Sequence, residues 1–120
     1  APQFAAVLVD SAVLAVGAVG LIGVATHWCT PDVVAMFDAW ETGDVAAARA
    51  VNARLLDSWS YETGDDAPNP GPAKAMLRHL GQPAGHCRPP MGADPDCLAD
   101  RAAQVWDDLV DARAAASAAT

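Results

Sequence analysis

One long apolar stretch near the start of the chain limits what the sequence can fold into. Residues 4–25, FAAVLVDSAVLAVGAVGLIGVA, contain a single charged side chain, Asp10. A run of this length can span a membrane, and its beginning could belong to a signal peptide. However, three glycines interrupt the run at positions 17, 20 and 23, and no Lys or Arg flanks it. We therefore favour a buried helix over 10–16, followed by a buried strand over about 20–25.

The rest of the sequence predicts helices separated by glycine and proline. Thr30, Pro31 and Asp32 together indicate a helix start, with a hydroxyl cap, a proline at the first position and an acid in the first turn. Gly43 is expected to end that helix. Asp44 is expected to cap the next one, which reaches about Tyr61.

Two further helices are predicted after a proline-rich loop. One covers about 73–80 and stops at Gly81, and the other begins near Asp96 or Cys97. Apolar residues at spacings of three and four give the last helix one buried face. Its alanine-rich tail, 111–120, is expected to fray.

A single strand among several helices is an unusual set of secondary-structure elements for a complete domain. A buried strand needs neighbouring strands to bond its backbone N–H and C=O groups. The sequence itself supplies only one or two short strands. We therefore expect the chain to be part of a larger α/β protein whose other strands flank residues 20–25.

Charge and cysteine content exclude several classes of function. The net charge of −8 and the scattered basic residues disfavour nucleic acids and anionic membranes as partners. Three cysteines form no even set and no C-x-x-C pair, which indicates reduced thiols and a cytoplasmic protein. His27, Cys29, His86 and Cys87 lack the spacing of structural zinc sites, so neither a metal nor another cofactor is expected.

Four stretches in this order resemble the carboxy-terminal part of the dihydrodipicolinate synthase and N-acetylneuraminate lyase family. GAVGLIGVA at 17–25 resembles the family's penultimate barrel strand, and MFDAWETGDVAAARAVNARLLDSW at 36–59 resembles the helix pair after it. PNPGPAKAMLRHLG at 68–81 and then RPPMG at 88–92 resemble the family's next segments. The glycine and acidic turn that usually precedes the strand is missing from residues 1–13.

The resemblance implies a fold, a reaction and a role for a few residues. The fold would be α/β, the C-terminal fragment of a (β/α)8 TIM barrel plus a helical C-terminal region, with residues 1–42 ending the barrel and 43–120 forming the helical region. The whole enzyme would hold pyruvate as a Schiff base and condense it with an aldehyde, as a homo-oligomer and commonly a tetramer. Ile22 is the one substrate-binding residue carried over, and no catalytic residue lies in this chain.

Lys74 is the only lysine, and in the resembling segment it is structural. The family's reactive lysine would lie on an earlier strand, so the isolated chain is expected to be inactive. Dihydrodipicolinate synthase is the best match, and a sialic-acid lyase or sugar-acid aldolase relative stays open. Two other interpretations remain: a non-catalytic helical interaction module, and a small protein anchored in a membrane by residues 4–25.

Overall fold

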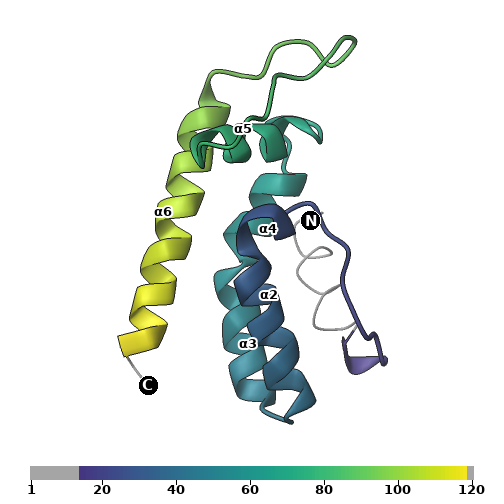
Figure 1. Cartoon of the computed structure of the whole chain (residues 1–120), viewed down its shortest axis with the longest axis vertical. Helices are drawn as coiled ribbons and strands as arrows, with labels where there is room; N and C mark the ends of the chain where they lie inside the picture. Colours follow the sequence, from purple (N-terminus) through teal and green to yellow (C-terminus); the bar gives the residue numbers. More distant parts are fainter. Residues whose placement is uncertain (1–13, 119–120) are drawn as a thin grey trace. The chain divides into compact units, whose positions relative to one another are not determined.

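A computed structural model describes residues 14–118 of the chain (Figure 1). Its regular elements, within that range, are five helices and no strand. They are α2 (Thr26–Glu41), α3 (Val45–Arg54), α4 (Leu56–Thr63), α5 (Gly71–His79) and α6 (Cys97–Ala118). The prediction of a mostly helical chain is confirmed. Most of the predicted helix at 10–16 lies outside the described residues.

The expected strand at 20–25 is absent from the part of the chain that the structure describes, which corrects the sequence prediction. Residues 18–23 have no regular secondary structure, and the side chains of Val19 and Ile22 are 98% and 103% exposed. The physical reason is the lack of a neighbouring strand in the described range. A strand exists only where a neighbour bonds its backbone, and no second strand is present among residues 14–118.

Helix α2 begins at Thr26, five residues before Pro31, the expected first helical position. The Thr30 hydroxyl donates a hydrogen bond to the Thr26 carbonyl, so it does not cap a helix end. Pro31 lies inside α2, and Cys29 has the non-helical angles φ −115° and ψ 16°. A proline lacks the N–H of an interior helical residue, and the backbone kinks just before it. The proline signal therefore marks a kink here and not the first turn.

The first of two compact units is Ala1–Ser60, in which α2 packs against α3 (Figure 1). The predicted cap at Asp44 is confirmed, because its carboxylate accepts a 2.9 Å hydrogen bond from the Ala47 amide. The single helix expected up to Tyr61 is interrupted at Leu55, which separates α3 from α4. Leu55 is fully buried, and the break occurs where its side chain enters the core.

An ion pair lies within this first unit. The Arg54 Nε donates to Asp32 Oδ1 at 3.1 Å, and the Asp32 side chain is only 3% exposed. The sequence suggested Asp32 as a first-turn acid in a new helix. Its observed partner is instead a guanidinium on the neighbouring α3.

The second unit is Tyr61–Thr120, in which α5 packs against α6. Gly81 follows α5 with φ +73°, a conformation that favours glycine and explains why that helix stops there. Helix α6 continues to Ala118, so the expected fraying after residue 110 is not observed up to that point. Alanine has the highest helix propensity and sustains this last part. The proposed boundary at residue 42 between barrel and helical region stays a prediction.

Candidate functional site

Ile22, the residue expected beside pyruvate, lies in the irregular segment before α2. Its side chain is fully exposed. The arrangement brings no nucleophile, acid or base together with it among the described residues. The expectation that Ile22 lies near a bound substrate therefore stays a prediction.

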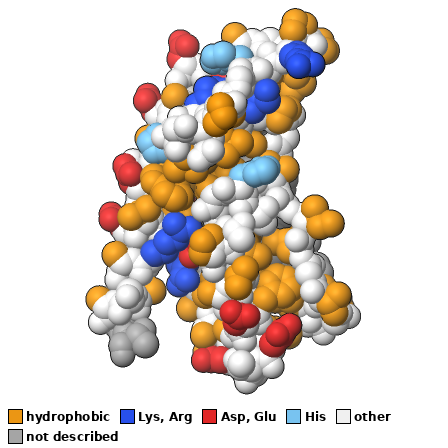
Figure 2. Space-filling model, in the orientation of Figure 1, with side chains coloured by type: hydrophobic (Ala, Val, Ile, Leu, Met, Phe, Trp, Pro, Cys, Tyr) orange, Lys and Arg blue, Asp and Glu red, His pale blue; other side chains and the backbone are white. Residues whose placement is uncertain are grey.

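A groove of about 390 Å³ lies between this segment and α2. It is lined by Gly20, Leu21, Thr26, Thr30, Val33, Val34, Phe37 and Asp38. In the lower half of the view in Figure 2, hydrophobic side chains reach the surface, and acidic side chains lie below them. Since Asp38 is the only charged residue in the lining, the groove suits apolar contact better than acid–base chemistry.

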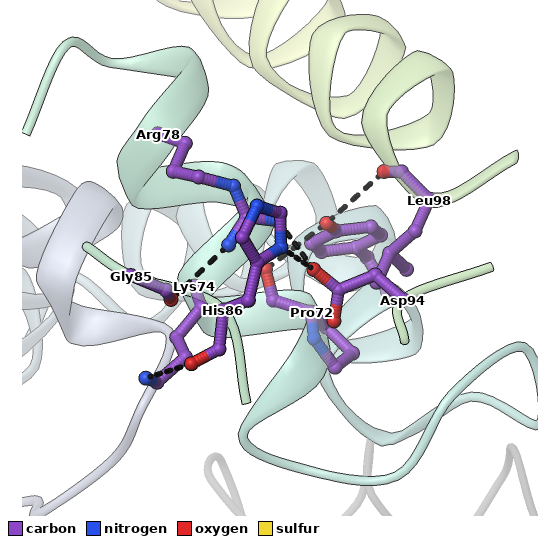
Figure 3. A network of polar contacts seen from close by, with 8 residues as sticks. Pro72, Lys74, Arg78, Gly85, His86, Asp94 and Leu98 are labelled. Atoms are coloured by element: carbon purple, nitrogen blue, oxygen red, sulfur yellow. Dashed lines mark hydrogen bonds and ion pairs between the residues drawn. The ribbon is translucent and has the colours of Figure 1, made fainter. Parts of the chain in front are cut away.

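A polar cluster in the second unit fastens the long connection between α5 and α6 (Figure 3). Arg78 Nη2 donates to Asp94 Oδ2 at 2.5 Å, and His86 Nδ1 lies 3.3 Å from the same oxygen. Lys74 Nζ donates to the His86 carbonyl at 3.0 Å, and Arg78 Nη1 donates to the Gly85 carbonyl at 3.3 Å. Two cationic side chains of α5 thus bind two carbonyls and one carboxylate of the 82–96 connection.

The charge state of Asp94 follows from these contacts. Burial raises the pKa of its carboxyl, since the side chain is only 13% exposed. The hydrogen bonds and charges of Arg78 and His86 act in the opposite direction and outweigh burial, so the net pKa is lowered. Asp94 is therefore ionised at neutral pH and serves as the anionic centre of the cluster.

Tyr61, near the end of α4, forms hydrogen bonds to both helices of the second unit. Its hydroxyl lies 3.0 Å from the Pro72 carbonyl and 3.3 Å from the Leu98 carbonyl, and its one proton is shared between them. The residue is 3% exposed, and burial raises the pKa of its phenol to about 12. Neither of its hydrogen bonds could form to a phenolate, because carbonyl oxygens only accept.

The raised pKa of Tyr61 predicts a loss of stability at high pH. Its contribution is complete below the unfolded pKa of about 10 and disappears as the pH rises through about 12. Over this window the free energy of unfolding should fall by about 3 kcal/mol. Tyr61 is the only tyrosine, so the phenolate absorbance in an alkaline titration reports it directly. The Tyr61→Phe variant should lack this pH dependence, whereas an absorbance midpoint near pH 10 would contradict the burial argument.

The structure brings together residues that the sequence analysis did not predict as a group. Asp94, His86 and Tyr61 come from separate segments, and no spacing rule joins them. Lys74, by contrast, was expected to be structural, and its amine bonds a backbone carbonyl. Throughout the described part of the chain there is no group of three His, Cys, Asp or Glu residues that could hold a metal ion. The same residues include no helix long and apolar enough to cross a membrane.

Comparisons with known proteins agree on one family. The sequence profile of the dihydrodipicolinate synthetase family matches residues 8–102. Relatives include the 4-hydroxy-tetrahydrodipicolinate synthases of Synechococcus sp. (strain CC9902), 38% identical over 71% of this chain, and of Parasynechococcus marenigrum, 37% identical over 76%. The enzyme of that name from Acidothermus cellulolyticus is 37% identical over 80% of this chain.

The shared region is a minor part of these relatives. The matches cover 28% of the Synechococcus protein and 30% of each of the other two. No solved structure matches the chain significantly.

Proposed function

Since the chain belongs to the dihydrodipicolinate synthetase family, we propose that it forms the carboxy-terminal part of a pyruvate-dependent Schiff-base lyase. The reaction most in keeping with its relatives is that of 4-hydroxy-tetrahydrodipicolinate synthase, which condenses pyruvate with aspartate semialdehyde. The observation that carries the proposal is the collinear family match over residues 8–102. In the whole enzyme this part has a structural role, in a cytoplasmic homo-oligomer.

The chemistry of the chain supports a structural role. A Schiff-base lysine needs a neutral amine that is free to attack a carbonyl. The amine of Lys74, the only lysine, instead donates to the His86 carbonyl at 3.0 Å. We propose that the reactive lysine and the groups that shuttle protons lie in the portion of the enzyme that precedes the matched region.

A sialic-acid lyase or sugar-acid aldolase would use the same fold and the same imine. Acceptor choice would depend on residues outside this chain. The relatives named above favour the synthase. A non-catalytic helical module remains the alternative of a different class.

A chimera tests the proposal. The Acidothermus cellulolyticus synthase is cut before the stretch that it shares with this chain and fused to residues 8–120. We expect the fusion to condense pyruvate with aspartate semialdehyde, while the 120-residue chain alone shows no turnover. A soluble, folded fusion without activity would count against the proposed role of this chain in the synthase.

A further inference from the structure

We draw no further inference here: the strongest candidate, the mostly apolar hollow of about 450 Å³ in the connection between α5 and α6 that His86, Cys87, Pro89, Gly92 and Ala93 line, carries nothing because its thiol, Cys87, is a lone cysteine and nothing among the described residues shows what would occupy the hollow.

Discussion

Replacing Leu98 by alanine should lower the free energy of unfolding of the 120-residue chain by about 3 kcal/mol. Leu98 is 1% exposed at the start of α6, and its Cδ2 would lie 3.7 Å from a Cβ added at Gly71 on α5. Shortening it leaves a cavity where α6 packs on α5, because glycine offers no side chain to fill the space. Urea unfolding followed by far-ultraviolet circular dichroism measures the loss.

Val110→Ala is the control for this substitution. Val110 lies on the same helix and is 41% exposed, so its replacement should change stability by less than about 0.5 kcal/mol. The free energy of unfolding of a small domain is only about 5–15 kcal/mol. The Leu98→Ala substitution should therefore lower the urea midpoint clearly. Equal effects of the two variants would show that α6 does not pack through Leu98.

The second large effect is expected at the ion pair of the first unit. Arg54→Met keeps the length of the side chain and removes the guanidinium that lies 3.1 Å from the Asp32 carboxylate. Asp32 is 3% exposed, and a buried charge that loses its cation is strongly destabilising. We expect a loss of about 3 kcal/mol, measured as for Leu98.

Arg49→Met provides the matched comparison. Arg49 is exposed on the same helix, and the same substitution should cost less than about 0.5 kcal/mol there. If Arg54→Met were as mild as Arg49→Met, the pair would be a surface contact that contributes little.

Local signals in the sequence predicted the parts of the fold that depend on neighbouring residues. The cap at Asp44 and the stop at Gly81 are decided within one helical turn, and both are observed. The start of α2 was misplaced because Thr30 and Pro31 fit a helix start and a helix kink equally well. Only the residues before them, 26–29, distinguish the two, and Thr26 can bond the Gly23 carbonyl.

The candidate sites depend on contacts between distant residues, which a single sequence does not encode in any spacing. Arg78 and Asp94 are sixteen positions apart, and Tyr61 and Leu98 are thirty-seven apart. The strand at 20–25 failed for a related reason. Its residues have the composition of a buried strand, but pairing requires other strands, and residues 14–118 contain none.

We propose that the chain contributes structure to a pyruvate lyase whose reactive lysine lies elsewhere. This proposal is tested by trapping the chimera with pyruvate and borohydride, which reduces an imine to a stable amine, and by measuring intact and peptide masses. We predict one reduced pyruvyl group per fusion chain, located in the synthase part, with Lys74 unmodified. The 120-residue chain treated in the same way should gain no mass. A reduced pyruvyl group on Lys74, in either protein, would contradict the account.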